Sequence, residues 1–480
     1  MEDAGMWPTA LLFMHNVAAL AVVARVLIRP RMEPSVRLAW IMIVEAVPLV
    51  GIMAYLLFGE VRMSTAEVQK MADVRDRLTG LRRPSPNTIE HPPRRLEPVF
   101  AANRSVGGLP AVDGNRMELL PEGDDAIDHM INAIDSARDH VHIVFYIWLD
   151  DHSGTRMAQA VERAAARGVA CRVIVDALGS RQFVRSDLWR RLQAAGAECV
   201  TAFPWGIPLI SMLFQRLDLR NHRKIMVVDN RIAFTGSRNC ADMAFAVKAK
   251  YAPWVDILMS AEGPVVRQLQ GVFLSDWMSY TGRDLGEMLV MVDAVDEPGL
   301  AAQVVPTGPD RRAGSISDCL ATMILNARHE VVLTTPYYVP DMALDAAIRA
   351  AARRGVEVTM ILPARNDSVI VGATSEGFYY GLLLAGVRLH LFQPGLLHAK
   401  IATVDRRYAM IGSANLDRRS FELNYEVNMA IYDRQMTEEL NLRQASYIDR
   451  SVELTLDQVR NWGMLRRIRN NLLALASPLL

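Results

Sequence analysis

The chain has 480 residues, which is long enough for more than one domain with sizeable hydrophobic cores. Lys plus Arg and Asp plus Glu both total 53, so the chain lacks the basic excess that nucleic-acid-binding proteins usually carry, and we expect no nucleic-acid partner. The four cysteines are widely spaced without a C-x-x-C pair, which favours small buried side chains over a zinc site or a disulfide framework.

Two apolar segments open the chain, at residues 7–28 and 38–58. With 22 and 21 residues, each is long enough to cross a hydrocarbon core of about 30 Å at about 1.5 Å of rise per residue. Glu2 and Asp3 stand where a cleaved signal peptide would carry basic residues. The sequence therefore predicts a transmembrane hairpin over residues 1–60.

Glu45 lies inside the second apolar segment and requires a partner, because an unpaired carboxylate is strongly disfavoured in a bilayer. In an antiparallel hairpin, Arg25 and Glu45 differ in depth by about 6 Å, and we expect them to pair. Arginines in the hairpin loop favour a cytoplasmic loop, but basic residues after the second segment weaken that inference. The side of the membrane that the rest of the chain faces stays open.

Residues 61–114 connect the hairpin to the rest of the chain. Residues 64–81 are charged and helical in character, whereas residues 82–110 are rich in proline and polar residues, including the string PSPNTIEHPPRR. We interpret the second stretch as a linker. The catalytic region then begins near Asn115.

An internal repeat divides the remaining chain into two halves, residues 115–295 and 296–480. The string ARDHVHIVFYIWLDD from Ala137 matches ARHEVVLTTPYYVPD from Ala327, and ERAAARGVACRVIVD matches RAAARRGVEVTMILP. In each half, apolar strands alternate with helices that end near a glycine. This alternation predicts an α/β fold with helices on both faces of the sheet.

Each half then contains the motif H-x-K-x4-D-x6-G-S-x-N on a predicted strand, tight turn and second strand. A histidine and a lysine two residues apart project from the same face of an extended segment. One occurrence of this spacing carries little weight, but two in one chain are not a coincidence. The motif residues are His222, Lys224, Asp229, Ser237 and Asn239 in the first half, and His398, Lys400, Asp405, Ser413 and Asn415 in the second.

These residue types suit attack on a phosphodiester without a metal or another cofactor. One neutral histidine attacks phosphorus while the other, protonated, gives a proton to the leaving oxygen. The lysines supply positive charge, and Asn239 and Asn415 supply amide donors for the phosphate oxygens. Ser237 and Ser413 either add hydroxyl donors for phosphate or shape the turn.

Four carboxylates accompany the motifs. Asp229 and Asp405 belong to the catalytic motif but lie at the hairpin turns, so a role in salt bridges or turn hydrogen bonds is favoured over direct catalysis. Asp256 and Glu426 follow the motifs on apolar strands, where a carboxylate requires a partner. We expect these two to hold the second ring nitrogen of a motif histidine.

The duplicated motif resembles that of the phospholipase D superfamily, and the strings DLRNHRK, ILPARNDS, GLLHAK and GSANLDRRSFELNYE are similar to those of bacterial cardiolipin synthases. The resemblance covers nearly the whole chain. It implies two pseudo-symmetric phospholipase-D-like α/β/α halves that form one active site after the transmembrane hairpin. It also implies that His222 is the nucleophile, which forms a phosphohistidine, and that His398 is the acid and base.

The resemblance further implies an enzyme of the bacterial cytoplasmic membrane that joins two phosphatidylglycerols into cardiolipin and releases glycerol. The alternatives are a membrane-bound phospholipase-D-type hydrolase, a phosphatidyltransferase with phosphatidylethanolamine as donor, and a non-catalytic membrane scaffold. Intact His, Lys and Asn in both halves argue against the scaffold. The implied partners are phospholipids in the bilayer; the sequence is compatible with a homo-oligomer and does not define the oligomeric state.

Two further apolar segments have open roles. The first half carries about 14 extra residues before its motif, including WGIPLISMLF at 205–214, which favours a core helix or loop over a lip that admits acyl chains. The chain ends with RNWGMLRRIRNNLLALASPLL from Arg460. This amphipathic tail forms either a packed terminal helix or a helix at the membrane interface, and we favour the interface.

Overall fold

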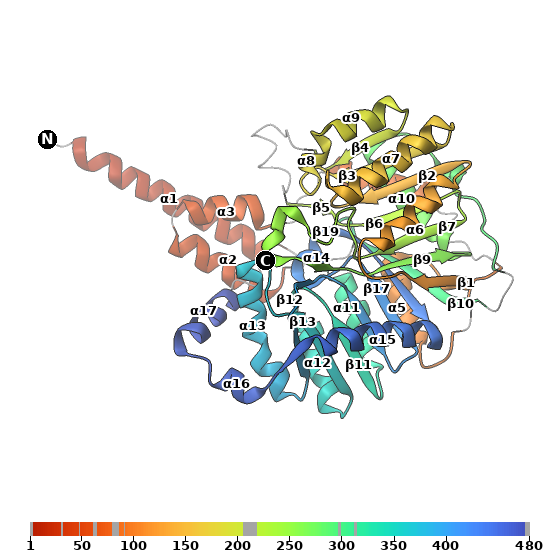
Figure 1. The fold of residues 1–480 in the computed structure, drawn as a ribbon. Coiled ribbons are helices and arrows are strands. Elements are labelled where there is room, and N and C mark those ends of the chain that lie inside the picture. Colours follow the sequence, from red (N-terminus) through yellow and green to blue (C-terminus); the bar gives the residue numbers. More distant parts are fainter. Residues whose placement is uncertain are drawn as a thin grey trace.

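The computed structural model describes residues 3–29, 32–47, 49–60, 65–78, 86–90, 92–204, 218–295, 299–311 and 314–475. The described part forms a large body from which a group of N-terminal helices projects on one side (Figure 1). The apolar insert at 205–214 and the end of the tail, residues 476–480, lie outside the described residues.

The first half of the repeat alternates strands and helices, as the sequence predicted. Its elements are β1 (Val112–Leu119), α6 (Asp125–Asp135), β2 (His140–Phe145), α7 (His152–Ala166), β3 (Ala170–Asp176), α8 (Arg181–Val184), α9 (Asp187–Ala194), β4 (Glu198–Ala202), β5 (Arg220–Asn221), β6 (Lys224–Val228), β7 (Ile232–Gly236), β8 (Trp254–Val255), β9 (Leu258–Glu262) and α10 (Val265–Thr281), with 3-10 turns at Ala246–Tyr251 and Gly286–Met288. The helices α7 and α9 stop just before Gly168 and Gly196, whose φ angles of 88° and 96° are readily adopted by glycine.

The second half repeats this order and adds a C-terminal extension. Its elements are β10 (Leu300–Thr307), α11 (Ser315–Leu325), β11 (Glu330–Thr334), β12 (Tyr338–Val339), α12 (Met342–Arg353), β13 (Glu357–Pro363), α13 (Val369–Leu384), β14 (Arg388–Phe392), β15 (Leu396–Leu397), β16 (Ile401–Val404), β17 (Tyr408–Gly412), β18 (Leu416–Asp417), α14 (Arg418–Glu422), β19 (Asn424–Tyr432), α15 (Arg434–Asp449), β20 (Ser451–Leu454), α16 (Leu456–Arg460) and α17 (Met464–Leu475). Gly355 and Gly386 end α12 and α13 with the same φ angles, 88° and 96°, as their counterparts in the first half.

Both halves contribute to one sheet, which has 16 strands among the described residues. Its main path runs β20-β14-β13-β11-β16-β17-β19-β10-β1-β9-β7-β6-β2-β3-β4. The order is nearly symmetric about the junction of β1 and β10, which pair antiparallel. Each strand of the first half on this path therefore has a counterpart in the second half at the same distance from the junction, while β20 is an addition of the second half, and the predicted α/β fold with two related halves is confirmed.

Helices cover both faces of the sheet (Figure 1). One face is covered by α6, α7 and α9 in the first half and by α11, α12 and α13 in the second, each group over a core of its own. On the other face, α10 and α15 share a single core that contains residues of both halves, including Phe273 and Leu440. The central strand β6 is buried throughout, which explains its continuous apolar sequence. All four cysteines are free, as their spacing predicted.

The N-terminal helices differ from the predicted hairpin. They are α1 (Asp3–Ile28), α2 (Pro34–Ala46) and α3 (Val50–Phe58), packed through a cluster that includes Val26, Trp40 and Tyr55. Within the part of the chain that the structure describes, no helix is both long enough and apolar enough to cross a bilayer. The expected second span, 38–58, is not one helix but two, and Pro48 falls between them in the sequence, where proline disfavours continuation of a helix.

The expected pairing of Arg25 with Glu45 is wrong. Nε of Arg25 donates to Oε1 of Glu60 at 2.7 Å, and the hydroxyl of Tyr55 donates to the same carboxylate at 2.6 Å. Glu45 is exposed. Division of the second apolar segment lets α3 pack on α1 as well as on α2, so that Glu60, two residues beyond α3, reaches the last turn of α1.

Residues 61–114 contain two helices, α4 (Thr65–Arg77) and α5 (Glu97–Gly107). The first agrees with the helical character predicted for 64–81. The second lies in the stretch interpreted as a linker, and that interpretation is wrong for residues 97–107, because Asn103 donates to the hydroxyl of Tyr408 at 2.8 Å and Phe100 packs edge-on against the same ring. Proline and polar residues at its start masked an amphipathic helix. The domain boundaries themselves stay predictions.

Candidate active site

Two pairs of short parallel strands connect the halves and set the positions of the motif histidines. In the first pair, β5 lies beside β19 with Asn221 opposite Tyr425. In the second, β15 lies beside β8 with Leu397 opposite Val255. The next residue along each pair is a histidine on one strand and a carboxylate on the other. Each histidine therefore meets a carboxylate that comes from the opposite half.

His222 contacts Glu426 through one ring nitrogen. Its Nδ1 lies 2.9 Å and 3.0 Å from the two carboxylate oxygens. The hydroxyl of Ser413 and the side-chain amide of Asn424 donate to the same carboxylate. A neutral imidazole that donates its Nδ1–H to Glu426 has its lone pair on Nε2, which is the form required for nucleophilic attack. This geometry agrees with the orienting role expected for Glu426.

His398 has the corresponding contact with Asp256. Its Nδ1 lies 2.6 Å from Oδ1 of Asp256, and the hydroxyl of Ser237 donates to the same oxygen at 2.6 Å. The indole ring of Trp254 lies against the imidazole, with ring centroids 4.9 Å apart. As with His222, the Nε2 atom is the one left for chemistry. The contact agrees with the orienting role expected for Asp256.

Burial controls the protonation of both histidines. It lowers the pKa of His222 to about 4, an effect that Lys224 reinforces and Glu426 opposes. Burial and Lys400 likewise lower the pKa of His398, against the opposing effect of Asp256. Although burial raises the pKa of Glu426, its contacts with His222 and Lys224 hold it below the usual value. At neutral pH, His222 is therefore an uncharged imidazole beside an ionised carboxylate.

The two motif lysines are buried beside the histidines. Nζ of Lys224 donates to the carbonyl oxygen of His222, and Nζ of Lys400 donates to that of His398, both at 2.6 Å. Burial lowers the pKa of Lys224 to about 7 and that of Lys400 to about 8. The nearby carboxylates oppose this effect, and the charge of Lys400 further lowers the pKa of Lys224. An anion placed between them would favour their charged forms.

The motif asparagines stand at the ends of the loops that follow β7 and β17. Oδ1 of Asn239 accepts the backbone N–H of Ile147 at 3.2 Å, which leaves its NH2 group as the donating end. Asn415 is also buried, and its Oδ1 has no hydrogen-bond partner in the described part of the chain. Phosphate binding by these two amides stays a prediction.

The hydrogen bonds of the motif serines bear on the two roles that the sequence left open for them. Ser237 and Ser413 each donate their single hydroxyl proton to an orienting carboxylate, and each accepts a backbone N–H, from Ile257 at 3.0 Å and from Val427 at 2.9 Å. A hydroxyl has one proton, so in these hydrogen bonds neither serine offers it to phosphate, and phosphate binding by the serines stays a prediction. Their contacts favour positioning of the carboxylates over phosphate binding.

Asp229 and Asp405 lie at the hairpin turns, away from the histidines, and a direct catalytic role for them is not supported. The carboxylate of Asp229 accepts three backbone N–H groups from the first residue of β2 and the two residues before it, at 2.8–2.9 Å, and Asp405 makes the equivalent contacts where β11 begins. Both residues have left-handed backbones, with φ of 53° and 51°, which aspartate tolerates in a tight turn. They join each hairpin to the neighbouring strand.

Three side chains beside the histidines were not identified from the sequence. The ring of Tyr146 contacts His222 edge-on, with centroids 4.8 Å apart, while Trp254 contacts His398 and Asn424 contacts Glu426. Trp254 and Asn424 each lie two residues before an orienting carboxylate, so an extended alignment of the two motifs would have found them. Tyr146 directly follows β2 and lacked such a signal.

Each motif histidine is held by a carboxylate of the other half, so neither half contains a complete site. Two copies of this motif around one shared site are the arrangement of a phospholipase-D-like protein. Comparison with known proteins agrees with this class. The family model described as "Cardiolipin synthase, PLD-like domain" matches residues 130–277 and 320–445, more than half of the chain, and "Phospholipase_D-nuclease N-terminal" matches residues 16–60. The chain belongs to the cardiolipin synthase family of phospholipase-D-like proteins.

Similar proteins match over nearly the whole length. Cardiolipin synthase A of Proteus mirabilis (strain HI4320) is 36% identical over 98% of this chain and 97% of its own. Cardiolipin synthase A of Pectobacterium carotovorum subsp. carotovorum (strain PC1) is also 36% identical, over 98% of both chains. Among solved structures, phosphatidylserine synthase of Haemophilus influenzae Rd KW20 aligns with a TM-score of 0.61 at 15% identity, over 80% of this chain and 100% of that chain, which shows that the two share the fold.

Proposed function

We propose that this protein is a cardiolipin synthase that transfers a phosphatidyl group from one phosphatidylglycerol to another and releases glycerol. The observation that carries the proposal is the pair of motif histidines, each held by a carboxylate of the opposite half, in a chain that matches cardiolipin synthases from end to end. Phospholipids in the bilayer are accordingly its substrates.

In the first step, Nε2 of His222 attacks the phosphorus of the donor lipid. A P–N bond forms, the bond from phosphorus to the glycerol oxygen breaks, and His398 gives its Nε2 proton to that oxygen. Glu426 accepts a hydrogen bond from Nδ1 of His222 and so stabilises the positive charge that develops on the ring. The products are free glycerol and a phosphatidyl group on His222.

In the second step, the roles of the histidines reverse. His398, now neutral, takes the proton from a hydroxyl group of a second phosphatidylglycerol, whose oxygen attacks the phosphohistidine. The P–N bond breaks, the new P–O bond completes cardiolipin, and His222 returns to its neutral form. Asp256 keeps the ring of His398 in one orientation through both steps.

Positive charge for the nonbridging oxygens comes from Lys224 and Lys400, and amide donors come from Asn239 and Asn415. A phosphate anion would raise the pKa of both lysines from about 7 and about 8, so that substrate binding completes their protonation. It would also raise the pKa of His398 and favour the protonated acid that the first step requires. The scheme calls for no metal.

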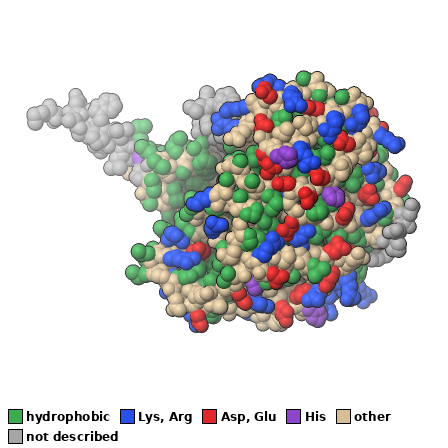
Figure 2. Space-filling model, viewed as in Figure 1, with side chains coloured by type: hydrophobic (Ala, Val, Ile, Leu, Met, Phe, Trp, Pro, Cys, Tyr) green, Lys and Arg blue, Asp and Glu red, His purple; other side chains and the backbone are tan. Residues whose placement is uncertain are grey.

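The location that we propose is the bacterial cytoplasmic membrane, with the apolar residues of the N-terminal helices inserted in it. Exposed apolar side chains gather on these helices, among them Phe13, Leu20 and Met42 (Figure 2). The sequence predicts a multi-pass arrangement. Extraction of isolated membranes with alkaline carbonate tests insertion: the full chain should stay in the membrane pellet, and release into the supernatant would contradict it.

The test of the reaction is turnover of phosphatidylglycerol vesicles by the purified full chain in the presence of a chelator, with products identified by mass spectrometry. Cardiolipin and glycerol, lost in His222→Ala, are the expected result. Phosphatidic acid as the only lipid product would make the enzyme a hydrolase. Product formation only after addition of phosphatidylethanolamine would identify that lipid as the phosphatidyl donor.

A further inference from the structure

The C-terminal helix α17 has its polar and apolar faces reversed relative to an ordinary surface helix. Five of its apolar residues follow one stripe at helical spacing and are 55% to 81% exposed, namely Met464, Leu465, Ile468, Leu472 and Leu475, whereas Leu473 and Ala474 are half-buried. The residue that α17 buries is Asn470, which is 2% exposed. A helix that packs on a soluble body normally turns its apolar stripe inwards.

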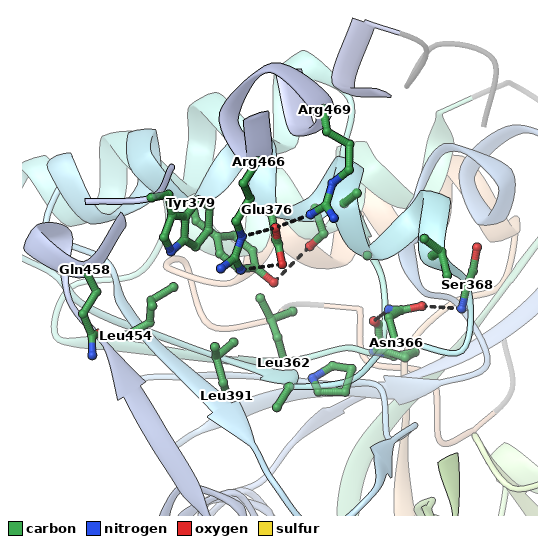
Figure 3. Close-up of a pocket in the computed structure, with 18 of the residues that line it drawn as sticks. Leu362, Asn366, Ser368, Glu376, Tyr379, Leu391, Leu454, Gln458, Arg466 and Arg469 are labelled. Carbon is green, nitrogen blue, oxygen red and sulfur yellow. Dashed lines mark hydrogen bonds and ion pairs between the residues drawn. The ribbon is translucent and has the colours of Figure 1, made fainter. Parts of the chain in front are cut away.

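Polar contacts attach the inner face of α17 to α13. Glu376 of α13 accepts hydrogen bonds from Arg466 at 2.8 Å and 3.0 Å, from Arg469 at 3.2 Å and from Asn470 at 2.7 Å, and Figure 3 shows the two arginines converging on it beside a cavity of about 760 Å³. The two helices also approach closely, since a Cβ on Gly377 would lie 3.0 Å from Cβ of Ala474. The outward direction of the stripe is therefore fixed by four hydrogen bonds and a tight crossing.

The helix beneath extends the apolar surface. Beyond the crossing, α13 exposes Val369 and Ile370 at one end and Tyr380 and Leu384 at the other, each at least 44% exposed. We define these four residues and the stripe of α17 as the α13–α17 apolar face. An exposed apolar surface of this extent is typical of a contact with another molecule or with lipid.

Two observations identify the lipid bilayer as the partner of this face. First, α13 and α17 lie on the side of the body from which α1, α2 and α3 project, where apolar residues are also exposed (Figures 1 and 2). Second, Arg467 lies at the border of the stripe, is exposed, and has no ion pair with any residue that the structure describes. An apolar stripe bordered by arginine suits the boundary between acyl chains and anionic headgroups.

We infer that the α13–α17 apolar face is a second membrane contact, with α17 lying in the interface of an anionic bilayer parallel to its surface. This inference rests on the proposed membrane location but not on the proposed reaction. Together with the N-terminal helices, α17 gives the body two attachments, which restrict its tilt relative to the lipid surface. Because α17 packs on the second half, the attachment holds the half that carries His398.

Fluorescence from single labelled positions tests the contact. The full chain carrying Ile468→Cys or Leu472→Cys, labelled with an environment-sensitive dye, is reconstituted into vesicles of phosphatidylglycerol and phosphatidylcholine with or without doxyl-labelled lipid. The matched control is Leu442→Cys on α15, which is 65% exposed, compared with 55% and 63% for the two test positions. Labelling of the unsubstituted protein gives the background from Cys199, the one cysteine that is not fully buried.

We expect a blue shift and doxyl quenching at positions 468 and 472, and neither at 442. Absence of quenching at both test positions would overturn the inference. A blue shift that depends on protein concentration in detergent, without doxyl quenching in vesicles, would also overturn it and identify a second copy of the chain as the partner.

Charged substitutions give an activity test that leaves the fold intact, because the stripe faces outwards. Ile468→Glu together with Leu472→Glu should lower turnover on vesicles by about tenfold, since two side chains lose apolar burial, and should leave turnover in detergent-mixed micelles unchanged. Leu442→Glu should change neither. Equal loss in vesicles and micelles would contradict a membrane contact. If the unsubstituted protein makes no cardiolipin, the proposed reaction fails while the fluorescence test still decides the contact.

Discussion

The two halves of the active site share one motif but place their histidines in different surroundings. His222 faces the edge of Tyr146 and holds a carboxylate that also accepts from Ser413 and Asn424. His398 lies against Trp254 and holds a carboxylate that has one further side-chain donor, Ser237. Both halves thus place a histidine, a carboxylate and a motif serine together, and Tyr146, Trp254 and Asn424, which lie outside the motif, make the two histidines unequal.

Two of the residues that make the histidines unequal, Asn424 and Trp254, occupy equivalent positions in the repeat. Asn424 and Trp254 each precede an orienting carboxylate by two residues, yet one is an amide that donates to the carboxylate and the other is an aromatic ring that packs on the histidine. Two-step transfer requires one nucleophile and one proton carrier, so a duplicated site gains from such divergence. Four predictions test how far the inequality extends.

Loss of the histidines should have the largest effect and should separate their roles. His222→Ala should abolish covalent labelling by the donor lipid and lower turnover by at least about 10⁴-fold. His398→Ala should also stop turnover of phosphatidylglycerol, but it should still form the covalent intermediate from a donor with a nitrophenyl leaving group, which needs no acid. Release of nitrophenol in a stopped-flow burst measures this step.

The control for both variants is His329→Ala, which removes an exposed histidine at the start of β11 and should leave the burst unchanged. A burst in His222→Ala and none in His398→Ala would reverse the assignment of nucleophile and acid.

Removal of the orienting charges should have the next largest effect. Glu426→Gln and Asp256→Asn should each lower kcat by about 10²-fold or more, because the histidines lose the partner that fixes their orientation and stabilises the imidazolium. The pH dependence should differ between them. Asp256 raises the pKa of His398, so Asp256→Asn should lower that pKa and move the alkaline limb of the rate profile to lower pH.

Glu426 raises the pKa of His222, which burial has already brought to about 4. Glu426→Gln therefore changes a pKa far below neutral and should leave the alkaline limb of the rate profile, which reports His398, unchanged. Rate profiles of the two variants, measured with the same lipid, provide the comparison. An equal shift in both would show that the halves are electrostatically alike.

The serines should have smaller effects, and these too should be unequal. Ser237→Ala should lower kcat by about tenfold and Ser413→Ala by about threefold, because Asp256 loses its one further side-chain donor whereas Glu426 keeps Asn424. Turnover on phosphatidylglycerol vesicles measures both. A greater loss of kcat in Ser413→Ala than in Ser237→Ala would mean that the hydrogen bond from Asn424 does not hold Glu426 in position.

The turn aspartates should affect stability and leave the chemistry nearly intact. Asp229→Asn and Asp405→Asn keep a side chain that accepts a left-handed backbone but lose one charged acceptor for the backbone N–H groups. Each should destabilise the fold by about 1–2 kcal/mol with kcat at low temperature unchanged. Thermal denaturation followed by circular dichroism measures the loss. A change in the pH profile would bring these residues back into the catalytic mechanism.

Much of this site could be predicted from the sequence because the chain carries its motif twice. The repeat located His222, Lys224, His398 and Lys400, and the unfavourable position of a carboxylate on an apolar strand marked Asp256 and Glu426 as histidine partners. What the sequence did not specify was which carboxylate meets which histidine. That choice is made by the registers of β5 on β19 and β15 on β8, which are contacts between residues about 140 to 200 positions apart.

The errors have local physical causes. Hydrophobicity alone predicted one helix over 38–58, where Pro48 divides the segment, and depth matching alone paired Arg25 with Glu45 when the fold brings Glu60 closer. The proline-rich composition near α5 hid the apolar face that packs on Tyr408. The role of the serines stayed open at the level of sequence, because a hydroxyl in a motif gives no sign of which acceptor it will meet.

The crossed carboxylates also have a consequence during synthesis. Glu426 follows His222 by 204 residues, so at typical bacterial rates of translation it leaves the ribosome about 10 to 40 s later. During that interval the nascent chain carries His222, the proposed nucleophile, without Glu426, and for most of the interval also without His398. In the mechanism proposed above, an unfinished chain therefore lacks both the carboxylate that orients its nucleophile and, for most of its synthesis, the acid, so the order in which the chain is made delays assembly of the site until both halves exist.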